Sequence, residues 1–289
     1  MKILKILLLC LLALLFAFVI DFFLGYSVHP DISYGEKDIN TMKIFMPDDA
    51  SDNCGAVLFI HGGSWSGGSL EEEGIRCRIV ANGGYIAATM NYTLRGDENA
   101  DDYTVDIVLD EIDRAIKRLC TFAEERGITL ERIGISGYSA GAHLALLYSY
   151  SRGDECPLEI AFVSSMAGPA DISPEVWGDR SASVVAGWLS GEEITEEMLW
   201  GCEADRLFEE VSPISYVGEN TPPTMLIHGE RDNVVPIANA ENLAEKLKEN
   251  GIDYDFMRLP SSDHSLLQNP IKHLKYYLLL LDYCDTYFN

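Results

Sequence analysis

The feature that most constrains the fold of this chain is a serine flanked by glycines at residues 137–141, which read Gly-Tyr-Ser-Ala-Gly. Residues typical of a buried strand precede this segment, and the run at 142–147 is typical of a helix. Glycines two positions before and after Ser139 remove the Cβ atoms that would clash in a tight turn. The pattern therefore predicts a sharp strand-to-helix turn that projects the serine hydroxyl from the edge of a sheet, as in a nucleophile elbow.

A second glycine segment follows the apolar run at 56–60 and begins at His61. Backbone N–H groups in a glycine turn can stabilise the oxyanion that forms in acyl transfer, because no side chain blocks their approach. The candidate donors are Gly62 and Gly63, together with the N–H of Ala140. The alternative is a simple turn at the end of a strand, but the serine turn downstream favours the oxyanion loop.

Two further segments supply an acid and a base. A short apolar strand beginning at Thr224 leads into a loop that carries Asp232, and His264 follows the next strand, at 254–259. A serine hydroxyl is a poor nucleophile unless an imidazole takes its proton and a carboxylate holds that imidazole in the right tautomer. The chain order of serine, aspartate and histidine provides all three groups.

These features together resemble the α/β-hydrolases, specifically the esterase/lipase group with an HGG oxyanion loop, which includes small acetyl-esterases, feruloyl-esterase-like and arylformamidase-like enzymes. The resemblance extends over about residues 32–288. Its motifs lie at residues 61–65, 137–144, 212–215, 228–232 and 263–264. It implies a catalytic triad of Ser139, Asp232 and His264. It also implies an oxyanion hole formed by the backbone of Gly62, Gly63, Ser64 and Ala140.

Other residues compete for these roles. His143 lies four residues after Ser139, but the elbow turns the serine away from the helix, so we expect a helix-face residue. We expect His61 to brace the oxyanion loop and His228 to end a strand. Asp171 follows the preceding strand, where some members of the fold place the acid; we favour Asp232, which lies on the loop after the next strand.

The pattern of strands and helices indicates one domain over residues 26–289, with a mainly parallel sheet and helices on both faces. The resemblance implies that this is an α/β-hydrolase domain. Helical spacing of apolar residues is clear at 105–122 and 240–247. Asn269 and Pro270 predict the start of the last helix. On one face it carries the apolar residues Ile271, Leu274, Leu278 and Leu281.

The alternation is interrupted by a segment at about 171–223, which we expect to form a small cap-like insertion over the site. It contains three of the four tryptophans. We predict a small apolar or aromatic substrate pocket, although these rings could instead pack the insertion against the body. The candidate pocket residues are Trp65, Tyr138, Trp177, Trp188 and Trp200.

The N-terminal residues 1–25 read as a signal anchor or a signal peptide. Lys2 and Lys5 precede an unbroken apolar run at 6–20, and no small-residue cleavage site is evident. We therefore expect a membrane anchor with an extracytoplasmic catalytic domain, because lysines precede the span and acidic residues follow it. The alternative is a protein secreted after cleavage of the segment.

The formal net charge is −25, from 21 basic and 46 acidic residues. So acidic a chain repels nucleic acid and anionic lipid headgroups and accepts neutral substrates more easily. The acidic stretch at 97–110 lacks the spacing of a calcium loop, and the seven cysteines show no zinc pattern. We expect no metal and no cofactor; the sequence leaves the oligomeric state open.

These features predict a serine carboxylesterase that hydrolyses small neutral esters through an acyl-enzyme intermediate. Amide or peptide hydrolysis is an alternative, because arylformamidase-like and prolyl-peptidase-like enzymes share the motifs. A non-catalytic binding module on the same fold is the alternative from a different class, although such relatives usually lose a triad residue. Fold alone does not give the substrate.

Overall fold

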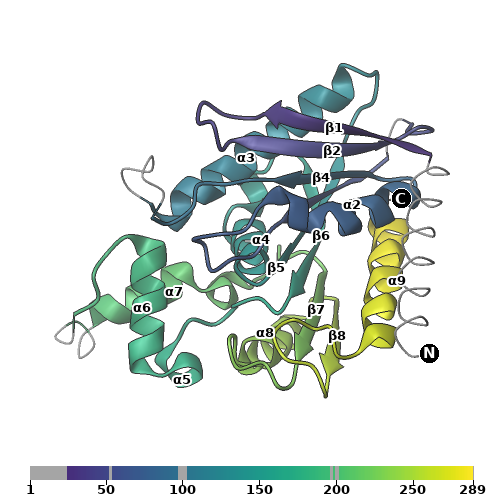
Figure 1. Ribbon diagram of the computed structural model, residues 1–289. Helices are drawn as coiled ribbons and strands as arrows, with labels where there is room; N and C mark the ends of the chain where they lie inside the picture. Colours follow the sequence, from purple (N-terminus) through teal and green to yellow (C-terminus); the bar gives the residue numbers. More distant parts are fainter. Residues whose placement is uncertain (1–24, 52–53, 97–102, 196–197, 199–201, 289) are drawn as a thin grey trace, which may run out of the picture.

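Short buried apolar runs build the centre of the molecule. The computed structural model describes residues 25–51, 54–96, 103–195, 198 and 202–288. Its eight strands form one sheet in the order β1-β2-β4-β3-β5-β6-β7-β8 (Figure 1). The strands are β1 (Tyr26–Ser33), β2 (Thr41–Pro47), β3 (Ala56–Ile60), β4 (Ile86–Met90), β5 (Arg132–Tyr138), β6 (Glu159–Met166), β7 (Thr224–Gly229) and β8 (Tyr254–Leu259).

The sheet is mixed, with its antiparallel part at one edge. β1 pairs with β2, and β2 with β4, in antiparallel fashion, whereas all the remaining neighbours from β4 to β8 are parallel. Every residue of β3, β4 and β7 is buried, as expected of strands that are covered on both faces. The predicted α/β architecture with a mainly parallel sheet is confirmed.

Helices cover both faces of this sheet. They are α2 (Gly74–Asn82), α3 (Val105–Glu124), α4 (Ala140–Ser151), α5 (Pro174–Trp177), α6 (Asp179–Ser190), α7 (Cys202–Val211), α8 (Ala238–Glu249) and α9 (Pro270–Tyr287), with short 3₁₀ turns η1 (Leu70–Glu73), η2 (Gly153–Glu155) and η4 (Pro213–Tyr216). Val57 and Phe59 of β3 pack in one core with residues of α2 and α9. Leu58 and Ile60 pack in a second core with residues of α3, α4 and α8. This alternation follows from the two-residue period of a strand.

The helix α3 forms where the apolar spacing predicts it. Thr104 precedes the helix, and its hydroxyl accepts a hydrogen bond from the N–H of Ile107 at 3.4 Å. Such a cap satisfies one of the first N–H groups, which have no partner within a helix. The apolar positions of this helix that face the sheet are buried, namely Val105, Val108, Ile112, Ala115, Leu119 and Phe122.

The last helix, α9, does not pack on the sheet with the apolar face that was predicted from its sequence. Ile271, Leu274 and Leu278 of α9 are 71%, 60% and 59% exposed, and Leu281, the fourth residue of the predicted apolar face, is half-buried. The buried side instead carries tyrosines: the hydroxyl of Tyr276 lies 2.9 Å from that of Ser164, and Tyr283 donates to Asp255 at 2.9 Å. A tyrosine whose hydroxyl has a partner can bury its large ring, and these rings, with Leu280, bring this side of α9 onto the sheet.

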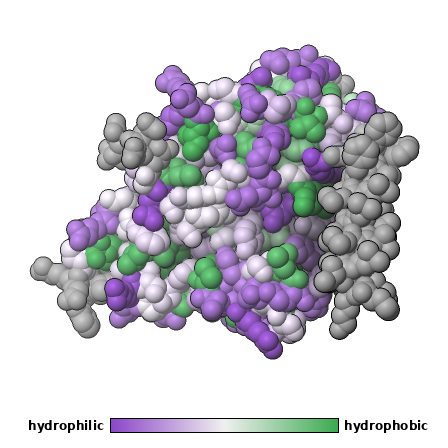
Figure 2. All heavy atoms as spheres, viewed as in Figure 1, coloured by the Kyte–Doolittle hydropathy of each residue, from purple (hydrophilic) through white to green (hydrophobic). Residues whose placement is uncertain are grey.

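The segment between β6 and β7 holds α5, α6, α7 and η4. In Figure 1 α5, α6 and α7 gather at one side of the molecule, away from α9. They contact one another, and α6 also contacts α3. The face drawn in Figure 2 is mainly hydrophilic, with separate apolar patches.

Residues 1–24, which contain most of the predicted anchor or signal peptide, lie outside the described residues. Among the helices that the structure describes, none is both long and apolar enough to cross a membrane.

Candidate active site

Ser139 lies at a strained turn between β5 and α4. Its backbone has φ 53° and ψ −120°, a region that residues with a Cβ rarely adopt. The two flanking glycines make the turn fit. A Cβ at Gly137 would lie 2.3 Å from the carbonyl carbon of Gly141, and a Cβ at Gly141 would lie 2.0 Å from the carbonyl oxygen of Ile60. The sharp turn predicted from the glycine spacing is present.

The structure brings Ser139, His264 and Asp232 together in one hydrogen-bonded chain. The Nε2 atom of His264 lies 2.9 Å from Oγ of Ser139, and its Nδ1 atom lies 2.7 Å from Oδ2 of Asp232. A carboxylate only accepts hydrogen bonds, so Nδ1 carries the proton and Nε2 is free to accept from the serine. The three residues follow β5, β8 and β7, whose carboxyl ends meet at one edge of the parallel sheet.

Asp232 is buried and remains ionised. Burial by itself would raise the pKa of this carboxyl, but hydrogen bonds from His228 and His264 and from the backbone outweigh it and hold the pKa well below its usual range. The backbone donors are the N–H groups of Val234 and Val235, both 2.9 Å from Oδ1. A fixed, negative Asp232 can therefore hold the tautomer and orientation of His264.

The rival carboxylate, Asp171, has different partners. Its Oδ2 accepts a hydrogen bond from the side chain of Asn242 at 2.8 Å, and its backbone N–H donates to the side chain of Asn239 at 3.0 Å. Both asparagines belong to α8. These contacts tie the loop after β6 to that helix.

The predicted oxyanion loop runs next to Ser139. A Cβ at Gly62 would lie 3.3 Å from Cβ of Ser139 and 2.9 Å from the carbonyl oxygen of Tyr138, so only glycine allows this approach. The next three residues all have positive φ: 113° at Gly63, 52° at Ser64 and 57° at Trp65. Ala140 is the first residue of α4, where an N–H has no acceptor within the helix.

Two other side chains support these loops. The ring of His61 is buried, stacks on Tyr92 at 4.3 Å and lies with Nδ1 2.7 Å from the carbonyl oxygen of Gly62. The hydroxyl of Tyr138 donates to the carbonyl oxygen of His264 at 2.8 Å, and burial raises the pKa of Tyr138 to about 12. His61 thus lies where it can brace the oxyanion loop, and Tyr138 holds the loop that carries His264.

The contacts of two histidines near this site were not predicted from the sequence. His228 has Nε2 3.2 Å from Oδ2 of Asp232 and 3.0 Å from the carbonyl oxygen of Val235. His143 is hydrogen-bonded to Trp65 and Val211. His228 lies four residues before Asp232, and that spacing was the available signal for its contact; the partners of His143 lie 78 and 68 positions away, so local spacing gives no signal for them.

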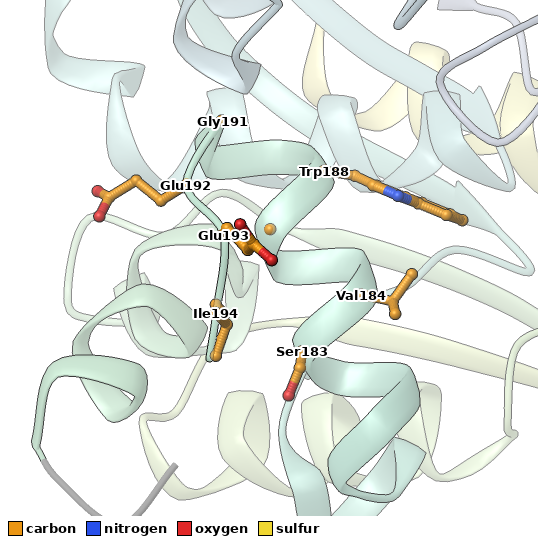
Figure 3. Close-up of a pocket in the computed structure, with 8 residues that line it drawn as sticks. Ser183, Val184, Trp188, Gly191, Glu192, Glu193 and Ile194 are labelled. Carbon is orange, nitrogen blue, oxygen red and sulfur yellow. The ribbon is translucent and has the colours of Figure 1, made fainter. Parts of the chain in front are cut away.

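Two cavities are lined by residues of the segment between β6 and β7. One, of about 400 Å³, is lined by Trp177, Val184 and Trp188 and by the loop directly after Asp232, including Val234. The other, of about 420 Å³, lies between α6 and the irregular segment at 191–194, and shares Val184 and Trp188 with the first (Figure 3). In Figure 3 these two side chains extend from the same side of α6.

Two other predicted pocket residues, Trp65 and Tyr138, line neither of these cavities. Trp65 is only 4% exposed, and its indole N–H is used by His143, so its ring packs beneath the oxyanion loop and lines neither of these two cavities. Trp200 lies outside the described residues. Arg95 stacks on Trp188, with its guanidinium carbon 4.1 Å from the centre of the ring.

Residues 42–247 match the BD-FAE family. The chain belongs to this family. The match spans both the oxyanion loop and the serine turn, and it confirms the predicted resemblance to the α/β-hydrolase esterases.

Over the aligned residues, curated relatives are about a quarter identical to this BD-FAE protein. It is 26% identical to esterase LipC of Mycobacterium tuberculosis over 81% of this chain and 58% of that protein, and 29% identical to esterase LipQ of the same organism over 81% and 56%. It is 24% identical to a probable isoprenylcysteine alpha-carbonyl methylesterase of Oryza sativa over 87% and 60%. The chain thus spans less than two thirds of the length of these relatives.

Solved structures share the fold. A truncated carbohydrate esterase from gut microbiota superposes with a TM-score of 0.72 at 18% identity, covering 91% of this chain and 97% of that one. Esterase B of Lactobacillus rhamnosis superposes with a TM-score of 0.68 at 21% identity, covering 90% and 88%.

Proposed function

We propose that this protein is a serine carboxylesterase. The observation that carries the proposal is the hydrogen-bonded chain from Oγ of Ser139 through His264 to the buried carboxylate of Asp232, with a glycine loop beside the serine. Membership of the BD-FAE family and the esterase names of the relatives support it. A non-catalytic binding module does not require an ionised carboxylate, an imidazole oriented by it and a strained serine that are joined by hydrogen bonds.

We propose a role for each group on the basis of this geometry. Ser139 Oγ attacks the ester carbonyl while Nε2 of His264 takes its proton, and Asp232 stabilises the imidazolium that forms. The backbone N–H of Ala140 and those of the Gly62–Ser64 loop meet the negative oxygen of the tetrahedral intermediate. His264 then gives the proton to the leaving alcohol, which leaves an acyl-Ser139. A water molecule then gives a proton to His264 and attacks the acyl carbonyl; the bond between the acyl carbon and Oγ breaks, the carboxylic acid is released, and His264 returns the proton to Ser139.

We propose small neutral esters as substrates. The cavity beside the Asp232 loop is of modest size, and the tryptophans on its wall favour an apolar or aromatic group. The strongly acidic chain disfavours anionic substrates. Acetyl and propionyl esters should therefore exceed octanoyl esters in kcat/KM.

A fluorophosphonate probe tests the chemistry directly, since it forms a covalent adduct only with an activated serine. We expect stoichiometric labelling, with the adduct located by mass spectrometry on the peptide that contains Ser139. A panel of acetyl to octanoyl esters, with an anilide matched to each, then ranks the substrates. A protein that is not labelled and hydrolyses no ester would refute the proposal, whereas faster turnover of the anilides would favour amide hydrolysis.

We further propose that the N-terminal segment holds the protein at a membrane with the catalytic domain on the outer side. The support is the sequence alone: Lys2 and Lys5, the apolar run at 6–20 and the lack of a small-residue cleavage site. N-terminal sequencing of the mature protein and protease treatment of intact cells test this. A soluble product that begins near Tyr26 would show a signal peptide, and a protected domain would show the reverse orientation.

A further inference from the structure

His143 uses both of its ring nitrogens outside the serine–histidine–aspartate chain. It is fully buried in α4. Its Nδ1 accepts a hydrogen bond from the indole N–H of Trp65 at 3.3 Å, and its Nε2 lies 2.8 Å from the carbonyl oxygen of Val211. An indole N–H can only donate and a carbonyl can only accept, so these partners require a neutral ring with its proton on Nε2.

These contacts join three parts of the site. Trp65 follows the oxyanion loop, and Val211 is the last residue of α7, whose final carbonyl groups receive no hydrogen bond from within the helix. The backbone N–H of His143 donates to the carbonyl oxygen of Ser139 at 3.0 Å. One residue therefore connects the serine turn, the oxyanion loop and the insertion between β6 and β7.

The oxyanion loop needs such an anchor. Ser64 and Trp65 both carry a Cβ and both have positive φ, a conformation that persists only where the surrounding structure holds it. Trp65 is held at two points: its carbonyl oxygen accepts from the N–H of Arg95 at 2.6 Å, and its indole N–H is bound by His143. Without His143, a buried indole N–H would lose its acceptor, and another arrangement of the loop could satisfy it better.

We infer that His143 is a positioning residue. Through Trp65 it holds the oxyanion loop in place beside Ser139, and through Val211 it fixes α7 against α4. The inference rests on the proposed esterase function, and it links two sequence motifs, His-Gly-Gly-Ser-Trp at 61–65 and the serine turn with its downstream histidine. Burial lowers the pKa of His143 to about 4, which keeps the ring neutral, as the two hydrogen bonds need, at neutral pH.

Three variants separate the two hydrogen bonds. His143→Phe keeps a planar ring but removes both bonds. Trp65→Phe removes the indole donor, with one ring, and leaves the bond from His143 to Val211. His143→Gln keeps an acceptor and a donor. We expect His143→Phe to lower kcat for an acetyl ester by about 10²-fold, the cost of one misplaced oxyanion donor, with KM within about twofold. Trp65→Phe should lose at least tenfold in kcat, and His143→Gln should recover much of the loss.

A matched control distinguishes positioning from simple destabilisation. Leu147 is also buried in α4, and Leu147→Ala should lower Tm without lowering kcat of the folded enzyme. The double variant of Trp65→Phe with His143→Phe should be no slower than His143→Phe alone, because both changes break one link.

Native kcat in Trp65→Phe, or losses that multiply in the double variant, would overturn the inference. If His143→Phe does not fold, Trp65→Phe and His143→Gln still decide it. An ester-inactive, unlabelled wild type would refute the proposed function itself, and with it this inference, whereas an active wild type with unaffected variants would refute only the role of His143.

Discussion

The loops after β6 and β7 start from neighbouring parallel strands, and each presents an aspartate at the same edge of the sheet, yet the two aspartates have different partners. Asp232 accepts hydrogen bonds from His264 and from two backbone N–H groups, and His228 lies beside it. Asp171 accepts from Asn242 of α8. Position at the end of a strand therefore does not decide which carboxylate serves a histidine.

The difference comes from the loops themselves. Asp232 turns back on its own loop, because its Oδ1 binds the N–H groups two and three residues onward. This turn leaves Oδ2 directed at His264. The loop of Asp171 instead continues into the insertion, and its backbone is held by Asn239. A carboxylate fixed by its own backbone can orient an imidazole, whereas one bound to an asparagine amide joins two segments.

The largest effect should come from Ser139→Ala. The kcat of this variant is the reference with which the kcat values of the two aspartate variants are compared. We expect kcat for a short ester to fall by at least about 10³-fold, because the attacking oxygen is lost while the oxyanion loop remains. The folded state should persist, as circular dichroism and Tm can show. Near-native turnover in this variant would remove Ser139 from the mechanism.

Asp232→Asn should be nearly as damaging. The amide keeps the size of the side chain but no longer favours the His264 tautomer with its proton on Nδ1, so we expect a loss on the order of 10³-fold in kcat at neutral pH. Steady-state rates measured beside those of the wild type check this. A loss below about tenfold would contradict the assignment of Asp232 as the acid.

The same variant should show a pH-dependent difference in stability. The pKa of Asp232 is lowered in the folded protein, so its ionised form stabilises the fold above the ordinary aspartate pKa of about 3.8, and this contribution is lost as the pH falls through the lower folded value. The difference in unfolding free energy between wild type and Asp232→Asn should therefore shrink between pH 5 and about pH 2. Urea unfolding of both proteins across that pH range measures this difference. A difference that stays constant would contradict the hydrogen bonds assigned to Asp232.

The smallest effect on activity should come from Asp171→Asn. Its partner Asn242 can still donate to the amide oxygen, so we expect kcat within about threefold of the wild type and a loss of stability of about 1 kcal/mol or less. Parallel assays of the two aspartate variants on one ester test the comparison. If Asp171→Asn were the slower enzyme, the two loops would have to exchange roles.

The sequence by itself determined the parts that depend on local spacing. Glycines around Ser139 specified the turn, because backbone groups approach to about 2 Å of where a Cβ would stand. Apolar periodicity specified α3, and the chain order of serine, aspartate and histidine named the groups that the structure places in contact.

Only the tertiary structure decided which contacts these residues make across the fold. The bond from His143 to Trp65 joins residues 78 positions apart, and no periodicity encodes such a contact. On α9 the isoleucine and leucines form the regular apolar pattern, but the buried face belongs to tyrosines whose hydroxyls find partners on β6 and β8. Burial of a polar group depends on a partner from elsewhere in the chain, and only the folded sheet brings that partner into place.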